Sequence, residues 1–147
     1  MLNISGINDG IVIDHIGAGH ALTIYKYLNL AKKDCCVAII TNAKSNKMVK
    51  KDIIKIEGDI EVDLNILRIL DNNITINVIK DGKISEKISP ILPELITNVI
   101  RCKNPRCITS LDESLNHKFK LTNKEKAVYR CYYCEQQFDK KQLAKLR

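Results

Sequence analysis

CKNPRC at residues 102–107 and CYYC at residues 131–134 decide how the last third of this chain folds. Each stretch begins and ends with cysteine, so residues 108–130 separate two close pairs of thiols. Two such pairs can surround one Zn²⁺ tetrahedrally, at Zn–S distances of about 2.3 Å. Because four sulfur ligands leave no position open for water or substrate, we predict a structural zinc site with the ligands Cys102, Cys107, Cys131 and Cys134.

The size of the segment around these cysteines explains why a metal is needed. A module of about 50 residues buries too little apolar surface to fold firmly alone, and metal binding can contribute on the order of 10 kcal/mol. Four ordinary buried thiols would not need paired spacing. A rubredoxin-like iron site favours a shorter spacing than that between Cys102 and Cys107. Cys35 and Cys36 are adjacent on a predicted strand, and we interpret them as small core side chains.

The first part of the chain predicts a second kind of domain. Short β-branched runs alternate with helical periodicity, and Asp81-Gly82 is a strong hairpin turn. The predicted strands are residues 10–16, 35–41, 51–57, 74–80 and 83–88, and the predicted helices are residues 18–30 and a segment capped by Asp63. The order β-α-β-β-α-β with an additional strand is the ferredoxin-like arrangement, with both helices on one face of the sheet.

The predicted fold class is therefore α+β, with a ferredoxin-like antiparallel domain followed by a small β-rich four-cysteine zinc domain. We predict a division into residues 1–96 and 97–147. Pro93 is expected to open a short helix near this boundary.

Charge is distributed unevenly between the two parts. Residues 1–97 contain 12 basic and 12 acidic residues, whereas residues 98–147 contain 12 and 5, so the whole net charge of +7 lies in the last third. A basic module indicates an acidic partner, either nucleic acid or an acidic protein surface. No apolar run approaches the ~20 residues needed to cross a bilayer. The sequence therefore predicts a cytoplasmic protein without membrane attachment.

Four motifs resemble one family when taken in order. They are VIDHI at residues 12–16, KDIIKIE at residues 51–57, the first cysteine pair with its following Ile108-Thr109, and the second cysteine pair followed by Glu135. Along essentially its whole length the chain resembles the regulatory chain of aspartate carbamoyltransferase. The resemblance implies a subunit without catalytic activity whose first domain binds ATP, CTP or UTP. It also implies a zinc domain that contacts the catalytic chain of this pyrimidine-biosynthesis enzyme, and regulatory homodimers formed through the first domains.

The resemblance also implies a nucleotide site. Asp14 matches a ribose-binding aspartate, Lys55 a lysine that reaches base and ribose, and Lys87 a lysine that binds the triphosphate. The full predicted set is Gly6, Ile7, Val12, Asp14, His15, Lys51, Lys55, Asn77, Ile79, Ile84 and Lys87. Lys51 and Lys55 are four apart on one predicted strand and therefore share a face. Without the resemblance, these lysines would be interpreted as solvated side chains, and His15 would be equally compatible with a structural and a functional role.

Two other function classes are compatible with parts of the sequence. The basic module and Tyr132-Tyr133 allow a nucleic-acid-binding zinc ribbon. Only 5% of the residues are aromatic, however, and the lysines near the end are typical of a solvated tail, so we do not expect nucleic acid as a partner. A small enzyme on a ferredoxin-like scaffold is the third class. The sequence contains neither a nucleophile–base pair nor a glycine-rich phosphate loop that would support it.

Overall fold

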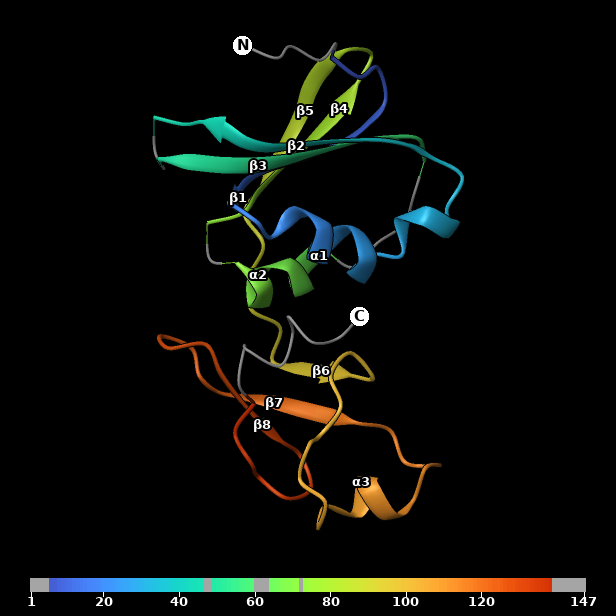
Figure 1. The fold of residues 1–147 in the computed structure, drawn as a ribbon, viewed down its shortest axis with the longest axis vertical. Helices are drawn as coiled ribbons and strands as arrows, with labels where there is room; N and C mark the ends of the chain where they lie inside the picture. Colours follow the sequence, from blue (N-terminus) through green and yellow to red (C-terminus); the bar gives the residue numbers. More distant parts are fainter. Residues whose placement is uncertain (1–5, 47–48, 60–63, 72, 139–147) are drawn as a thin grey trace. The chain divides into compact units, whose positions relative to one another are not determined.

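The structure, a computed structural model, describes residues 6–46, 49–59, 64–71 and 73–138 (Figure 1). The chain divides into two compact units, residues 1–90 and residues 91–147. Each unit has its own antiparallel sheet. Among the described residues, no helix is long and apolar enough to span a membrane.

The first unit contains a five-stranded antiparallel sheet in the order β2-β3-β1-β4-β5. Its elements are β1 (Gly10–Gly17), α1 (Ala21–Tyr27), η1 (Leu30–Lys32), β2 (Cys36–Lys44), β3 (Lys50–Glu57), η2 (Leu64–Ile66), α2 (Leu67–Leu70), β4 (Thr75–Lys80) and β5 (Lys83–Ile88). This order, with β5 as the additional edge strand, confirms the predicted ferredoxin-like α+β fold.

One face of the sheet carries the core of the first unit. The helices α1 and α2 lie against this face (Figure 1), and the opposite face has no helix among the described residues. Because side chains alternate along a strand, Ile54 and Ile56 of β3 point to the helices while Lys51 and Lys55 point away. Each fully buried isoleucine contributes roughly 1.5–3 kcal/mol through removal of its side chain from water.

The helices are shorter than the sequence predicted. The helix expected over residues 18–30 is α1 only, because Asn29 adopts a left-handed conformation with φ 57° and ends it. Gly19, at φ 93°, precedes the helix in a conformation that other residues rarely adopt. The predicted cap of the second helix, Asp63, lies outside the described residues.

Buried Asp52 ties three segments of the first unit together. Its side chain is fully buried and accepts hydrogen bonds from the backbone N–H groups of Gly19 at 2.9 Å, Ala21 at 3.2 Å and Asn42 at 3.0 Å. The first two lie at the start of α1 and the third lies on β2. A carboxylate at a helix N-terminus also interacts favourably with the helix dipole.

The second unit contains a three-stranded antiparallel sheet in the order β6-β7-β8. Its elements are β6 (Leu95–Thr97), α3 (Ile108–Leu111), β7 (Lys118–Asn123) and β8 (Val128–Cys131). The core is small, and Phe119 and Phe138 meet edge to face with ring centroids 5.9 Å apart. The buried Tyr129 hydroxyl donates to the carbonyl oxygen of Pro93 at 2.5 Å.

The segment after Pro93 differs from the prediction. The expected short helix is wrong, because Leu95 and Ile96 pair with Lys120 and Phe119 as part of β6. The predicted division left Leu95 and Ile96 in the first domain, but this pairing joins both residues to the sheet of the second unit. A three-residue strand has too little periodicity to be recognised in the sequence, and its pairing with β7 is a long-range contact.

Candidate metal centre and nucleotide-binding face

The four predicted zinc ligands lie together in the second unit. The sulfur atoms of Cys102, Cys107, Cys131 and Cys134 all lie within 4.8 Å of one another. The Sγ atoms of Cys102 and Cys134 are 3.6 Å apart, and those of Cys107 and Cys131 are 3.7 Å apart. A tetrahedral site with Zn–S bonds of about 2.3 Å has S–S edges of about 3.8 Å. The sulfur atoms are too far apart for disulfides, and all six cysteines of the chain are free.

Local hydrogen bonds shape the loop that carries the first pair. The side-chain Oδ1 of Asn104 accepts a hydrogen bond from the N–H of Arg106 at 3.0 Å, and the backbone carbonyl oxygen of Asn104 accepts one from the N–H of Cys107 at 3.1 Å. The Thr109 hydroxyl donates to the sulfur of Cys107 at 3.1 Å. This tight turn allows two cysteines separated by four residues to bind the same ion.

The second pair lies at the end of β8, where the chain turns back on itself. The N–H of Glu135 donates to the carbonyl oxygen of Cys131 at 2.9 Å, and Glu135 has a left-handed conformation with φ 64°. The sheet therefore supplies Cys131, and the turn that follows supplies Cys134.

The environment of the sulfur atoms requires a cation for full ionisation. Burial raises the pKa of the Cys102 and Cys131 thiols, and the neighbouring cysteines raise it further. Burial also opposes ionisation of Cys134, but hydrogen bonds from the Gln136 backbone and the Asn104 side chain lower its pKa to about 7. A divalent metal stabilises thiolates directly. Four crowded, shielded sulfur donors with tetrahedral spacing fit a structural zinc ion.

The predicted nucleotide residues lie on the face of the first sheet opposite the helices. Val12 of β1 is the cross-strand partner of Lys55 on β3 and of Asn77 on β4. Asn77 is in turn the partner of Lys87 on β5. Directly opposite residues share a face of the sheet. These four side chains therefore form a row across four strands, with a lysine at each end.

An extra residue in β5 brings a second row, formed by Ile79 and Ile84, to the same face. Ile79 of β4 pairs with Ile84, although Val78 pairs with Glu86, so Ser85 is a bulge. In a regular strand, Ile84 and Lys87 would point to opposite faces because they are three residues apart. The bulge places Ile84 beside Ile79, on the face that carries Asn77 and Lys87.

Asp14, His15 and Lys51 meet at the end of this face. Lys51 Nζ lies 2.8 Å from Asp14 Oδ1 in an ion pair that is mostly shielded from solvent. Partial burial opposes ionisation of Asp14, but the hydrogen bond and charge of Lys51, with the N–H of His15, lower its pKa. His15 Nδ1 lies 2.8 Å from Thr75 Oγ1. His15 has φ 57° and lies in a bulge of β1 against β3.

A basic hollow of about 940 Å³ adjoins His15 and Lys51. Lys44 and Lys50 also line it, and they are direct cross-strand partners on β2 and β3. Like charges placed opposite each other repel, so an anion at this hollow would relieve their repulsion. The hollow therefore suits a phosphate group better than a neutral ligand.

Gly6 and Ile7 lie just before β1 and belong to no strand or helix. The next residue, Asn8, accepts at its carbonyl oxygen from the N–H of Gly82 at 2.9 Å. The segment therefore passes beside the turn between β4 and β5, close to the end of the row that contains Ile84.

Two residues that organise the first unit were not among the predicted site residues, Thr75 on the open face of the sheet and Asp52 on the face that packs against the helices. Thr75 contacts His15, and Asp52 ties β2 to the start of α1. Thr75 could have been found from the alternation on β4, since it lies two residues before Asn77. The role of Asp52 could not be predicted from the sequence, because the three N–H groups that it binds are distant from it along the chain.

Comparison with known proteins agrees with this arrangement. Residues 2–90 match the model of the aspartate carbamoyltransferase regulatory chain, allosteric domain. Residues 94–144 match the model of the metal binding domain of the same chain. This chain belongs to the aspartate carbamoyltransferase regulatory chain family.

Relatives of this regulatory chain are similar over nearly their whole length. A regulatory chain from Clostridium acetobutylicum is 51% identical over 136 residues, which is 92% of this chain and 93% of the relative. One from Clostridium tetani is 50% identical over 137 residues, with 92% and 95% coverage. One from Bifidobacterium longum is 40% identical over 136 residues, with 92% and 98% coverage.

Family membership confirms several predictions. The chain is a non-catalytic regulatory subunit of aspartate carbamoyltransferase, not an enzyme in its own right. Its second unit is a metal-binding domain whose four-cysteine cluster fits zinc. The individual nucleotide-binding residues stay predictions.

Proposed function

We propose that this regulatory chain binds ATP, CTP and UTP on the open face of its first sheet. The observation that carries the proposal is the convergence of Lys51, Lys55 and Lys87 on one helix-free face with Asp14. A nucleoside triphosphate carries three to four negative charges and needs several cations, and lysine supplies mobile point charges. A carboxylate such as Asp14 can accept hydrogen bonds from ribose hydroxyls.

The rows of paired residues support a specific orientation of the nucleotide. Val12, Ile79 and Ile84 offer apolar contact for a base, and the backbone of Gly6 and Ile7 can read its edge. The cations of the face and of the adjoining hollow, Lys44 and Lys50 included, suit the phosphates. Lys51 is paired with Asp14. A phosphate group would therefore compete with Asp14 for Lys51, and a ribose hydroxyl would compete with Lys51 for Asp14.

We further propose that the first unit forms a homodimer through the edge strand β2. Residues 36–43 contain no charged side chain, whereas the other edge strand, β5, carries Lys83, Glu86 and Lys87. Charged residues on an edge strand discourage pairing with another chain. The uncharged part of β2, residues 36–43, is therefore better suited to pair with a second copy.

The regulatory effect is a matter of linkage. A nucleotide changes the activity of the partner only if it binds the states of the complex with different affinity. Coupling energies between distant sites are typically about 1–3 kcal/mol and are reciprocal. We infer that ATP and CTP compete for the open face, that the metal-binding unit contacts the catalytic chain, and that residues 90–100 transmit the effect. The setting is pyrimidine biosynthesis in the cytoplasm, a reducing compartment that suits six free thiols.

Calorimetric titration tests the nucleotide site. CTP and ATP are titrated into the zinc-loaded chain alone and with its catalytic partner. We expect competitive binding whose affinity changes when the partner is present. In Lys87→Ala we expect affinity to fall by roughly tenfold, on the scale of one charge-assisted hydrogen bond.

The matched control is Lys83→Ala, an exposed lysine on the same strand that pairs with Lys80 rather than Asn77. Its affinity should stay within about twofold of the wild type, since it lies outside the rows that carry the site. Equal losses in both variants, or none in Lys87→Ala, would contradict the site. If neither nucleotide binds in any state, the nucleotide function itself is wrong.

A further inference from the structure

The metal ligand Cys102 differs from Cys107 and Cys131 in what holds its backbone. The N–H groups of Cys107 and Cys131 donate to backbone carbonyl oxygens close by in the chain, at 3.1 Å and 3.0 Å. The N–H of Cys102 instead donates to a side chain, the Nδ1 atom of His117, at 3.3 Å. His117 lies 15 residues further along the chain. The placement of Cys102 therefore depends on one side chain from another segment.

Asn98 and His117 end the pairing of β6 with β7 through one backbone and one side-chain hydrogen bond. They follow the last regular pair, Thr97 with Lys118. The N–H of Asn98 donates to the carbonyl oxygen of His117 at 2.7 Å, as in a regular antiparallel pair. In the return bond, the N–H of His117 donates to Oδ1 of Asn98 at 3.0 Å. Asn98 has φ 58°, a left-handed conformation in which asparagine is enriched, and its side chain replaces its own carbonyl oxygen in this bond.

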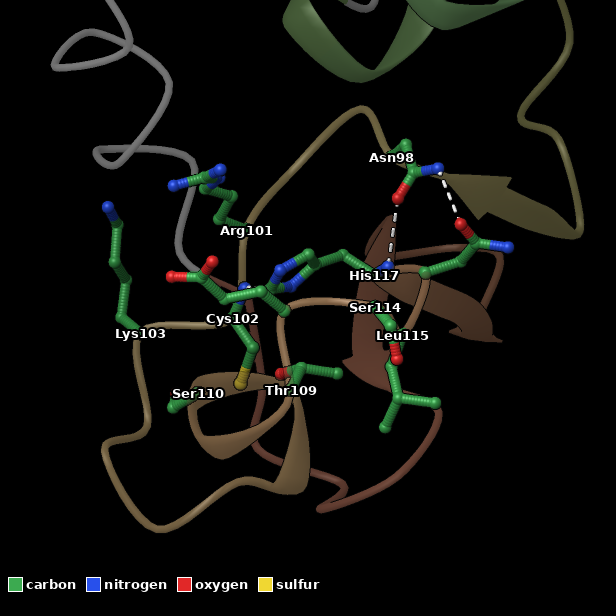
Figure 2. A pocket seen from close by; sticks show the side chains of 11 residues that line it. Asn98, Arg101, Cys102, Lys103, Thr109, Ser110, Ser114, Leu115 and His117 are labelled. Atoms are coloured by element: carbon green, nitrogen blue, oxygen red, sulfur yellow. Dashed lines mark hydrogen bonds between the residues drawn. The ribbon is translucent and has the colours of Figure 1, made fainter.

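His117 therefore holds both ends of residues 98–102, the segment that leads to the first metal ligand. Its backbone binds Asn98 at one end, and its ring binds the N–H of Cys102 at the other. Dashed lines in Figure 2 mark the bond from His117 to Asn98 and a second bond, in which Asn98 Nδ2 donates to Asn116 at 3.0 Å. In the same view the His117 ring lies at the backbone of Cys102, and the Cys102 sulfur points away from the ring. The ring thus fixes the backbone and leaves the sulfur to the metal.

The same side chains border a polar hollow of about 690 Å³ in the second unit (Figure 2). Asn98 is exposed and His117 is half-buried, so dense packing does not hold them in place. Their order is maintained by the hydrogen bonds that join them to each other, to Asn116 and to Cys102. The hollow also leaves space beside both residues, so substitutions at either position need not displace the core.

We propose that Asn98 and His117 are positioning residues of the metal centre, which hold Cys102 where the metal needs its sulfur. A segment that is ordered before an ion arrives loses less conformational freedom when the ion binds. Groups that orient metal ligands typically change metal affinity by about 10- to 100-fold. This role concerns the metal centre and does not depend on the proposed nucleotide site.

Substitutions at His117 test the role of its ring nitrogen. The zinc affinity of the full chain is measured by competition with a chromogenic chelator for the wild type, His117→Ala, His117→Asn and His117→Gln. The side-chain oxygen of asparagine can take the place of Nδ1, whereas the longer side chain of glutamine carries its oxygen near the place of Nε2. We expect affinity to fall about 10- to 100-fold in His117→Ala and His117→Gln, and to stay within about threefold of the wild type in His117→Asn.

Substitutions at Asn98 test the other member of the pair. Glycine accepts the left-handed conformation but removes the acceptor for the N–H of His117, whereas aspartate keeps an acceptor at Oδ1. We expect Asn98→Gly to bind zinc about fivefold more weakly or worse, and Asn98→Asp to stay within about twofold of the wild type.

The absorption spectrum of each variant saturated with Co²⁺ identifies the ligand set, because the geometry and the donors around the ion determine it. We expect the tetrahedral four-thiolate spectrum throughout, since a positioning residue changes the affinity and not the ligands. Wild-type affinity in His117→Ala would overturn the proposal. Equal losses in His117→Asn and His117→Gln would also overturn it, because only the bulk of the ring would then matter. Failure of the wild-type chain to bind zinc would contradict the metal centre itself.

Discussion

The five-stranded unit and the cysteine unit are stabilised in different ways. The first buries a continuous layer of isoleucines and leucines between its sheet and two helices. The second buries few large apolar side chains and gathers four cysteines within 4.8 Å. A small unit cannot obtain enough stability from burial, and a metal replaces the missing core. The unit with the larger core can therefore leave one face of its sheet uncovered.

Removal of the metal should cause the largest loss of stability, and this loss should be confined to the second unit. Chelation, or Cys131→Ser, should unfold residues 91–138 because a structural zinc contributes on the order of 10 kcal/mol. The first unit should keep its structure, since its core contains no metal ligand. Backbone NMR spectra before and after chelation would measure both units separately. The control is Cys36→Ser, which should retain zinc. The prediction of a core position for Cys36 was wrong, because its thiol lies exposed at the start of the edge strand β2. Loss of both units together would show that the two sources of stability are not independent.

Removal of a buried polar contact should have an intermediate effect in the first unit. Asp52→Ala leaves the N–H groups of Gly19, Ala21 and Asn42 without their acceptor. We expect a loss of about 3 kcal/mol or more, because each buried unsatisfied donor costs roughly 1–3 kcal/mol. Urea unfolding measures it. Asp9→Ala is the control, since Asp9 is exposed and should cost less than about 1 kcal/mol. An unchanged midpoint in Asp52→Ala would contradict the stabilising role of Asp52, and a fall in its zinc content would contradict the separation of the two units.

Acid should have the smallest effect, and it should act on the first unit through Asp14. The folded pKa of Asp14 is lowered, so its stabilising ion pair with Lys51 is present above the unfolded pKa of about 3.9. This contribution is lost as the pH falls through the lower folded-state pKa. We expect less than about 1 kcal/mol, measured by urea unfolding between pH 3 and pH 7. In Asp14→Asn this part of the pH dependence should disappear, and a wild-type profile in that variant would refute the assignment.

Much of the fold follows from local pattern. In β3 the alternation of lysine with isoleucine around Asp52 predicts one buried and one open face, and the structure agrees. The hairpin around Asp81-Gly82 forms as predicted, because Asp-Gly suits the left-handed conformations at both positions. The helix predicted after Pro93 failed, because pairing with β7 outweighs a weak local preference.

The bulges mark the limit of such prediction for the candidate site. Ile13 and Ile16 are three residues apart and are both fully buried, because β1 contains an extra residue relative to β3. Ser85 in β5 has the same effect and brings Ile84 to the face of Lys87. A bulge depends on the partner strand, so the periodicity of one strand cannot reveal it.

The sequence alone determined the metal ligands, the order of the strands in the first unit and the family, because these depend on residue type and spacing. The tertiary structure decided which side chains share a face, the role of Asp52 and the basic hollow beside Lys51. Each of these needs atoms from segments far apart in the chain to meet within hydrogen-bond distance. Local spacing determines what a residue can do, and long-range pairing determines which residues act together.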